Sequence, residues 1–376
     1  MAKLDVVTSV MRITAVEPIV VAVPLKVPAR SVHGAIATQR SALVRVTTDA
    51  GAEGWGNVDP VGGYSTMTAD DVAATIRRLV PALLGADALN PQRALAAMDA
   101  VVADKLEAKA AVEMALLDLA GRVLGVPVTT LLGGRVRDHV HFNAWIGTLP
   151  PEQAAREATE WVARGFRSAK IKVDGATDEG VARVAAVRAA VGDRLALRVD
   201  FNESLARVEA VPFIRRLEPY ALTLVEQPIS RDQIDGLAEI RRGIGIPLMA
   251  DESVTDPASL IEIVRRGAAD LVKVKVMKQG GFLRTKAMIE CAAAAGLRVV
   301  VGHGCGLTPS TLAEAALAAV SGAVIDGCEA VGPLKMAGDV VAEPVRLDSG
   351  TLRLSDAPGL GVTIDAEAVE RCRVGG

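Results

Sequence analysis

The sequence predicts an α/β protein whose larger part is a closed barrel of parallel strands, preceded by an α+β unit. Three observations lead to this fold class. Eight short apolar runs alternate with helical segments between residues 139 and 330, which is typical of repeated parallel β/α units. The first third of the chain lacks this alternation. The length of 376 residues suggests two or three domains at roughly 150 residues per domain.

The first third is predicted to begin with two strands and to continue as helices. Residues 12–25 and 40–49 are rich in β-branched residues, and a turn begins at Gly51 after the second run. Residues 26–39 contain proline and glycine and are predicted to form a loop between the two strands. Residues 68–134 have apolar side chains at helical spacing, so this region is predicted to be helical.

The barrel region is predicted from eight apolar runs, each of strand length. Helical stretches such as 181–192 and 260–268 lie between them and are predicted to be crossover helices. Residues 345–354 follow the last run and are predicted to form a hairpin outside the barrel. The eight runs are 139–147, 167–173, 195–202, 222–228, 246–253, 270–276, 297–304 and 323–330.

Composition excludes several classes of protein. The net charge is −3 and like charges do not cluster, which argues against nucleic acid and anionic lipid as partners. The longest stretch without a charged residue is 299–313, too short to span a bilayer. Four unclustered cysteines favour a reducing cytoplasm over a disulfide scaffold. The expected partner is a small molecule or a second subunit.

Polar residues stand at the carboxyl ends of the predicted strands, where barrel enzymes place their chemistry. Successive ones are separated by 24 to 28 residues, about one β/α unit each, so the barrel should bring them together at one end. Alternation along a strand points Lys170 and Lys172 to the same side. The full set is Lys170, Lys172, Asp200, Asn202, Glu226, Asp251, Lys275 and His303.

This set predicts a metal site between two lysines. The carboxylates of Asp200, Glu226 and Asp251 offer the oxygen ligands that suit Mg²⁺, and Mn²⁺ could substitute. Such a metal would stabilise the enediolate formed when the carbon next to a carboxylate loses its proton. Burial and nearby positive charge would keep Lys172 neutral as the base. Lys275 would be a protonated acid or the base for the opposite face.

At this point the chain resembles the muconate-lactonising subgroup of the enolase superfamily. The resemblance rests on the ordered lysines and carboxylates, on AKAAVEMALLDLAG (108–121) and on MADES (249–253), and it covers nearly the whole chain from Met11. It implies a capping domain formed by residues 1–134 and completed by 341–376, over a (β/α)7β barrel at 135–340.

The resemblance also implies roles for individual residues. Asp200, Glu226 and Asp251 would be the Mg²⁺ ligands, Lys172 and Lys275 the acid/base pair, and Lys170 an electrostatic partner of the substrate carboxylate. Asn202 is a further predicted substrate contact. Members of the subgroup include cycloisomerases, o-succinylbenzoate synthases, N-acylamino acid racemases and dipeptide epimerases, and all begin by forming an enolate.

Several positions depart from the family pattern. Asn57 stands where the family usually has Glu, and the eighth predicted strand lacks the Asp-x-Asp of many dipeptide epimerases. A His after strand seven pairs with an Asp after strand six in mandelate racemases, but here strand six supplies Lys275. His303 is therefore predicted to contact substrate or to have a structural role.

Two loops of the capping unit are predicted to act as lids. Residues 26–39 and 59–65 contain glycine and proline, and Arg30, His33 and Tyr64 would be specificity contacts. The remaining polar candidates are predicted to be structural or surface residues, namely Lys273, Lys278, His139, His141, Cys305 and Cys328.

The leading functional hypothesis is an Mg²⁺-dependent isomerase that removes the proton α to a carboxylate. The reaction would be either cycloisomerisation of a muconate-like diacid or racemisation of an amino-acid derivative. Two alternatives stay open: a syn-dehydratase that uses the same enolate, and a non-catalytic metal-binding scaffold. The resemblance also implies a homo-oligomer.

Overall fold

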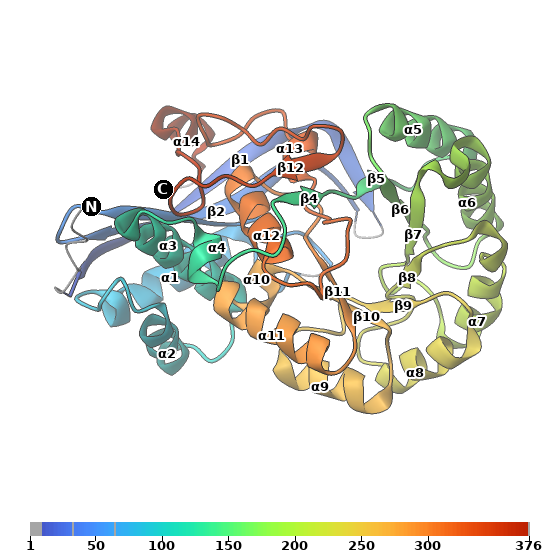
Figure 1. Ribbon diagram of the computed structural model, residues 1–376, viewed down its shortest axis with the longest axis horizontal. Coiled ribbons are helices and arrows are strands. Elements are labelled where there is room, and N and C mark those ends of the chain that lie inside the picture. The colour runs from blue at the N-terminus through green and yellow to red at the C-terminus, as the bar shows by residue number, and fades with distance from the viewer. Residues whose placement is uncertain (1–9, 32–33, 64, 375–376) are drawn as a thin grey trace.

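The computed structural model describes residues 10–31, 34–63 and 65–374, without the side chains of 29–31 and 34–35. The chain begins with a three-stranded antiparallel sheet in the order β1–β2–β3, followed by four helices (Figure 1). These elements are β1 (Ile13–Ser31), β2 (Gly34–Thr48), β3 (Glu53–Val58), α1 (Ala69–Leu83), α2 (Pro91–Val101), α3 (Leu106–Leu124) and α4 (Val128–Leu131).

Helix α3 is buried on nearly all sides because it lies between the antiparallel sheet and the rest of the molecule. Strand β3 packs against it through glycines, and a Cβ added at Gly56 would lie 1.9 Å from the Ala111 carbonyl oxygen. A Cβ at Gly54 would lie 2.2 Å from the Ala115 carbonyl oxygen. Only glycine permits this approach of strand backbone to helix backbone.

The buried carboxylates of α3 fasten distant segments to this helix. Asp118 accepts hydrogen bonds from the backbone N–H of Trp55 at 3.0 Å and of Leu360 at 2.8 Å. Glu113 accepts from the backbone N–H of Phe282 at 2.8 Å and of Leu283 at 2.9 Å. Since buried N–H groups need partners, these two acids connect α3 to the sheet, the C-terminal segment and the barrel.

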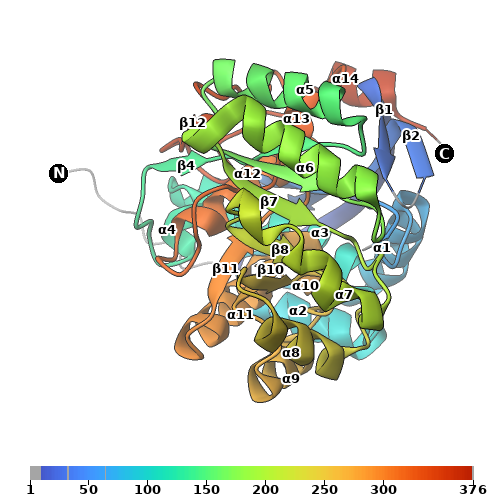
Figure 2. The same cartoon turned by 90° about the vertical axis from the view of Figure 1, so that its right-hand side faces the viewer.

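The barrel contains seven parallel strands in the order β5–β6–β7–β8–β9–β10–β11, with helices on the outside (Figures 1 and 2). Its strands are β5 (Ala144–Ile146), β6 (Ser168–Lys172), β7 (Ala196–Asp200), β8 (Leu224–Glu226), β9 (Leu248–Ala250), β10 (Leu271–Val274) and β11 (Arg298–Val301). The longer helices between and after them are α5 (Pro151–Ala163), α6 (Asp178–Val191), α7 (Arg207–Arg215), α8 (Ile234–Gly243), α9 (Pro257–Arg266), α11 (Phe282–Ala294) and α12 (Thr308–Ala319).

The interior of the barrel has an apolar layer below its polar end. Leu224, Met249, Leu271 and Val300 form a separate buried cluster inside the sheet. Side chains two residues further along β8 and β10 are Glu226 and Lys273, which are also buried. Because strand side chains alternate between the two faces, the same inward face changes from apolar to charged toward the carboxyl ends.

The eighth predicted strand, residues 323–330, is present only as isolated bridges. Val324 pairs with Val299 beside β11, and Cys328 pairs with Phe142 beside β5, both in parallel. These contacts close the barrel between its two edge strands, but the segment forms isolated bridges and not a continuous ladder. The prediction of eight regular strands was therefore wrong for this segment, although its position in the barrel was right.

The prediction of a loop at residues 26–39 was also wrong. Strand β1 continues to Ser31 and β2 starts at Gly34, with a register shift between Pro24 and Ala29. A bulge of this kind lets a strand pair continue through residues that interrupt a regular ladder. The predicted hairpin at 345–354 is a tight turn whose second arm, β12 (Thr351–Arg353), pairs instead with β4 (His139–His141).

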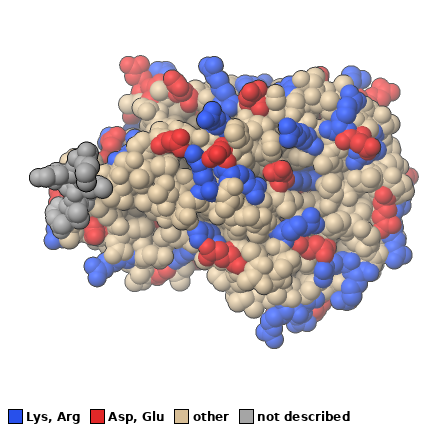
Figure 3. All heavy atoms as spheres, viewed as in Figure 1, with Lys and Arg blue, Asp and Glu red and all other residues tan. Residues whose placement is uncertain are grey.

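The C-terminal segment returns to the antiparallel sheet. Helix α14 (Ala366–Cys372) lies beside β1 (Figure 1), and the N–H of Val374 donates to the Val20 carbonyl at 2.9 Å. On the face in Figure 3, acidic and basic side chains are interspersed. No helix among the described residues has the length and apolar character needed to cross a membrane.

Candidate active site

The sequence-predicted polar residues gather at the carboxyl ends of the barrel strands. Lys172 on β6 is the register partner of Asp200 on β7, and Asp200 is the partner of Glu226 on β8. Asp251 follows β9 and Lys275 follows β10. The order of strands therefore places the three carboxylates between the two lysines, as the spacing in the sequence predicted.

These residues surround one cavity of about 150 Å³. The cavity is also lined by Ile36 from β2 and by Val61 and Gly62, so the antiparallel sheet unit covers the barrel end. Glu226 does not itself line the cavity, but it forms ion pairs with Lys170 and Lys273, which do. The predicted residues in the lining are Lys170, Lys172, Asp200, Asn202, Asp251, Lys275 and His303.

On one side of the cavity, Lys172 and Asp200 form an ion pair with an Nζ–Oδ2 distance of 2.6 Å. The Lys172 ammonium also donates to the Asn202 side-chain oxygen, and the Asn202 N–H donates to Asp200 Oδ1 at 2.9 Å. Burial would raise the pKa of Asp200, but the charges of Lys170, Lys172 and Lys273 hold it well below its usual range. Asp200 is therefore ionised.

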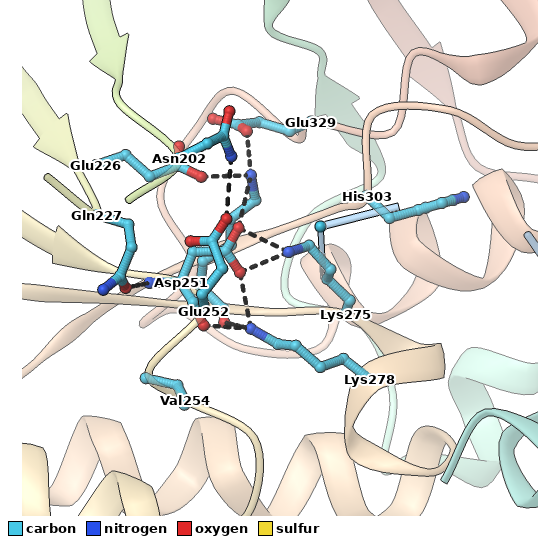
Figure 4. A network of polar contacts seen from close by, with 12 residues as sticks. Asn202, Glu226, Gln227, Asp251, Glu252, Val254, Lys275, Lys278, His303 and Glu329 are labelled. Atoms are coloured by element: carbon cyan, nitrogen blue, oxygen red, sulfur yellow. Dashed lines mark hydrogen bonds and ion pairs between the residues drawn. The ribbon is translucent and has the colours of Figure 1, made fainter. Parts of the chain in front are cut away.

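On the other side, Lys275 Nζ contacts both oxygens of Asp251, at 2.5 and 2.6 Å (Figure 4). Lys278 reaches the same carboxylate at 2.7 Å. Burial lowers the pKa of Lys275 to about 8. The negative charge of Asp251 opposes this shift, whereas the positive charges of Lys278 and Lys273 add to it. A lysine with such a pKa can give up its proton near neutral pH.

The centre of the cluster is Glu226, which is fully buried. Its carboxylate lies 3.2 Å from Lys170 Nζ and 3.0 Å from Lys273 Nζ. Both ammonium groups also contact Glu329 at 2.5 Å. Burial and the negative charge of Asp200 raise the pKa of Glu226 to about 8, against the effect of the two lysines.

Two lysines that were predicted to be surface or secondary charges belong to this cluster, so that prediction was wrong. Lys273 is 3% exposed and Lys278 is 7% exposed. Lys273 stands two residues before Lys275, and strand alternation could have indicated that it faces inward. Glu329 was also missed, because its segment follows no regular strand. Lys335 and Trp145 line the cavity and had no signal in the sequence.

Backbone around the carboxylates is held by two buried amide side chains. Gln227 accepts from the N–H of Asp251 at 2.9 Å, and its own φ is +33°. Gln279 accepts from the N–H of Lys275 at 2.7 Å. A positive φ is costly for a residue other than glycine, so the conformation at Gln227 shows that the surroundings of Asp251 are tightly determined.

His303 lies at the edge of the cavity, between the barrel and the antiparallel sheet unit. Its Nε2 is 3.4 Å from Asp59 Oδ2 and its Nδ1 is 3.7 Å from Glu314 Oε1. Asp59 is fully buried and accepts from the Ser41 and Ser310 hydroxyls at 2.5 Å each. His303 thus lines the cavity and is held by a buried polar network, which confirms a structural role, whereas its contact with substrate stays a prediction.

The other structural predictions concern histidines, cysteines and lids. The Nδ1 atom of His141 lies 2.9 Å from the Thr351 hydroxyl oxygen in the β4–β12 pair, outside the seven-stranded sheet. Cys328 is buried and does not line the cavity. Cys305 is also buried but does line the cavity. The Arg30 side chain, His33 and Tyr64 lie outside the described residues, so their predicted contacts stay predictions.

The chemistry of the carboxylates fits a hard dication. Asp200, Glu226 and Asp251 are buried and come from successive strands, and a divalent cation would offset both the burial and the repulsion by Asp200 that raise the pKa of Glu226. In the part of the chain that the structure describes, no three acidic, histidine or cysteine side chains lie close enough to enclose a metal. The ammonium groups of Lys170 and Lys273 lie among the carboxylate oxygens instead.

Two family models match the chain over most of its length. The mandelate racemase/muconate lactonizing enzyme N-terminal domain matches residues 13–133. The enolase C-terminal domain-like model matches residues 153–369.

Similar proteins include several isomerases. Muconate cycloisomerase 1 of Rhodococcus opacus is 34% identical, with 96% of this chain and 98% of the relative covered. L-Ala-D/L-Glu epimerase of Bacillus subtilis is 34% identical, covering 94% and 97%. N-succinyl-L-Arg/Lys racemase of Bacillus cereus is 32% identical, covering 97% and 98%.

Solved structures lead to the same family. The muconate lactonizing enzyme from Pseudomonas fluorescens complexed with muconolactone has a TM-score of 0.94 at 32% identity, covering 97% of this chain and 100% of that one. The dipeptide epimerase from Enterococcus faecalis V583, complexed with Mg and the dipeptide L-Leu-L-Tyr, has a TM-score of 0.90 at 30% identity, covering 94% and 100%. The chain therefore belongs to the mandelate racemase/muconate lactonizing enzyme family of the enolase superfamily, in its muconate-lactonizing-like subgroup.

Proposed function

We propose that this chain is an Mg²⁺-dependent isomerase that removes the proton α to a substrate carboxylate and forms an enolate. The observation that carries the proposal is one cavity in which Lys172 and Lys275 flank the buried carboxylates of Asp200 and Asp251, with Glu226 on the strand beside Asp200. The muconate cycloisomerase, epimerase and racemase relatives are all isomerases and match over nearly the full length.

The three carboxylates are the proposed ligands of Mg²⁺. When bound, this cation would supply positive charge that stabilises the negative charge developing on the substrate carboxylate. Support comes from the oxygen chemistry of the donor set and from the dipeptide epimerase that was solved with Mg. Lys170 and Lys273, which now neutralise these carboxylates, would move to positions beside the cation and the substrate.

The two flanking lysines are the proposed proton carriers. Lys275 Nζ, with its pKa lowered to about 8, would accept or return the α-proton on one face of the substrate. Lys172 Nζ would do so on the other face, and Asn202 would orient it through the hydrogen bond between them. Two carriers on opposite faces allow a proton to leave one face and return on the other, as racemisation requires.

The reaction outcome is proposed from the relatives. Cycloisomerisation of a muconate-type diacid and racemisation or epimerisation of an amino-acid derivative both begin from this enolate, and both occur among the relatives. A cytoplasmic location is part of the proposal and is supported by the four cysteines, each a free thiol in the structure. Assembly as a homo-oligomer is also proposed.

The proposal is tested by incubating the protein with Mg²⁺ and a panel of carboxylic acids in D2O. Exchange of the α-proton, followed by NMR, is expected for at least one acid. A lactone product would identify a cycloisomerase, and deuterium in both epimers would identify a racemase. A 2-keto acid would identify the syn-dehydratase instead. Bound Mg²⁺ without exchange of any acid would contradict the proposal and favour a non-catalytic scaffold.

The roles of the lysines are tested by Lys172→Met and Lys275→Met, which keep much of the side-chain volume. Each variant should lose turnover by at least about 10³-fold, while Mg²⁺ binding, measured by calorimetry, stays intact. For a racemase, each variant should retain exchange with one enantiomer only, because one proton carrier remains. Lys286→Met, on the outer helix α11, is the control. Unchanged turnover in both site variants would refute the assignment.

A further inference from the structure

One lysine in the cavity lies apart from the ion pairs described above. Lys335 is the last residue of α13 (Gly332–Lys335), which follows the segment that closes the barrel. Its Nζ lies 4.0 Å from the centroid of the Trp145 ring and donates to the Gly304 carbonyl at 3.0 Å. All three residues line the cavity. Lys335 and Trp145 therefore form a wall of the cavity beside β5 and β6.

The partners of Lys335 differ from those of the other cavity lysines. Lys170, Lys172, Lys273 and Lys275 each contact at least one carboxylate within 3.0 Å. Among the described side chains, Lys335 has no carboxylate partner, and the contacts of its ammonium are the Gly304 carbonyl and the Trp145 ring face. It is half-buried and lines the cavity, so a group bound in the cavity can reach its ammonium. A partly buried ammonium of this kind is stabilised when an anion binds.

The charges around Lys335 favour an anion at this place. Burial lowers the pKa of Lys335 to about 8, and the positive charges of Lys172 and Lys170 lower it as well. Cys305 and Glu157 act in the opposite direction, and Glu157 lies on the outer helix α5. At neutral pH most of the Lys335 population is still protonated, so the wall carries positive charge.

We propose that Lys335 determines specificity by binding a second anionic group of the substrate, so that the substrate is a dicarboxylate or a similar dianion. One carboxylate would lie at the proposed cation between the two catalytic lysines, and the second would pair with Lys335 against the Trp145 ring. This inference rests on the proposed function for the identity of the first site. The second site stands on the contacts of Lys335.

The proposal chooses between substrate classes. A muconate-type diacid and an N-succinyl amino acid each carry a second carboxylate away from the reacting carbon. A dipeptide with a free amino terminus would instead bring an ammonium toward Lys335, and like charges in a partly buried site repel each other. The structure thus favours diacid substrates over free dipeptides.

The test compares N-succinyl-L-phenylalanine and cis,cis-muconate with the methyl esters of their distal carboxylates. Binding to the Mg²⁺-loaded protein is measured by calorimetry, and turnover is measured as α-proton exchange or lactone formation. The wild-type protein should bind at least one diacid about 10- to 100-fold more tightly than its ester, as expected for a charge-assisted hydrogen bond. A wild-type protein that binds neither diacid, or binds each no better than its ester, overturns the inference.

Variants of Lys335 separate the two proposals. Lys335→Met should raise KM for the diacid by about 10- to 100-fold. It should change kcat by less than about threefold and leave KM for the ester unchanged. In the wild type, KM for the diacid should rise above about pH 8, because Lys335 loses its proton there. Lys335→Arg should keep the preference for diacid over ester and should not show this rise, because arginine stays protonated. Lys286→Met is the control for net charge, and thermal unfolding confirms that each variant is folded.

The outcomes distinguish the inference from the proposed function. If α-proton exchange occurs and Lys335→Met does not change the preference for diacid over ester, the inference fails and the proposed function stands. If a diacid binds in a Lys335-dependent manner and no acid exchanges its α-proton, the inference stands and the proposed function fails.

Discussion

The charge of each ionised residue inside the barrel must be compensated by neighbouring side chains, and Lys273 shows this most directly. Its ammonium lies 3.0 Å from Glu226 and 2.5 Å from Glu329, and none of the three side chains is more than 3% exposed. A buried charge costs several kcal/mol of desolvation unless partners compensate it. Lys273 therefore compensates the buried charge of Glu329 and opposes the rise that burial causes in the pKa of Glu226.

The first prediction concerns Lys273→Met. The substitution leaves Glu226 and Glu329 with one ammonium fewer, so we expect the free energy of unfolding to fall by about 3 kcal/mol at pH 7, as measured by urea titration. Lys286→Met removes a lysine that pairs with Glu290 along α11 and should change stability by less than about 0.5 kcal/mol. Equal stabilities of the two variants would contradict the structural role of Lys273.

Helix α3 connects the two parts of the molecule at the scale of secondary-structure elements. Glu113 on α3 accepts from the first N–H groups of α11, which have no partner within their own helix. Gly281 precedes α11 with φ +118°, and a Cβ there would lie 2.6 Å from Glu113 Oε2. The carboxylate and the glycine together fix how the barrel helix meets the capping unit.

The second prediction is a pH dependence caused by Glu113. Burial raises its pKa from 4.5 to about 7, although the two N–H donors act in the opposite direction. Between these values the folded state binds a proton that the unfolded state has lost, so stability is full below about pH 4.5 and falls as the pH rises to 7. The unfolding free energy of the wild type, relative to that of Glu113→Gln, should therefore fall by roughly 3 kcal/mol as the pH rises across this range. A difference that is independent of pH would show that Glu113 does not titrate there.

The third prediction concerns the packing of β3 on α3. Gly56→Ala places a Cβ 1.9 Å from the Ala111 carbonyl oxygen, which requires the strand or the helix to shift. We expect a loss of about 3 kcal/mol or more, or an insoluble product, when unfolding is followed by circular dichroism. Gly322→Ala, where a Cβ would meet nothing within 4 Å, should stay within about 0.5 kcal/mol of wild type. A soluble Gly56→Ala variant of wild-type stability would show that the approach is not required.

At the scale of the whole molecule, the cavity is closed by parts that are far apart in sequence. Ile36, Val61 and Gly62 from the capping unit face lysines and carboxylates from β6 to β10. The Arg231 guanidinium after β8 donates to the Gly63 carbonyl at 2.6 Å, which ties one predicted lid to the barrel. The division into 1–134 with 341–376 and 135–340 remains a prediction, but contacts across that division build the site.

The fourth prediction concerns the proposed cation. After treatment with EDTA, addition of Mg²⁺ should raise the thermal midpoint by a few degrees, because a ligand at 100 times its Kd stabilises the folded state by about 2.7 kcal/mol. Asp251→Asn should abolish this shift. Glu367→Gln, with the side chain 91% exposed on α14, should keep it. The same Mg²⁺ shift in the Asp251→Asn protein would contradict the proposed ligand set.

Much of the barrel could be predicted because its signals are local. Seven of the eight apolar runs contain a barrel strand, and the residues at their ends face one cavity. The remaining segment was misassigned because 323–330 makes only bridges, and apolar composition does not distinguish a ladder from a closing segment. Residues 26–39 were misassigned as a loop because a bulge in β1 accommodates residues that usually end a strand.

The sequence by itself determined the fold class and the positions of Lys172, Asp200, Glu226, Asp251 and Lys275 at the strand ends, because both depend on periodicity and on spacing along the chain. Only the tertiary structure decided which buried carboxylates pair with Lys273 and that Lys335 lies on Trp145 in the cavity wall. Burial and pairing depend on which residues other elements bring nearby. That information is absent from the chain around either lysine, since a lysine side chain has the same local pattern on a surface and in a charged interior.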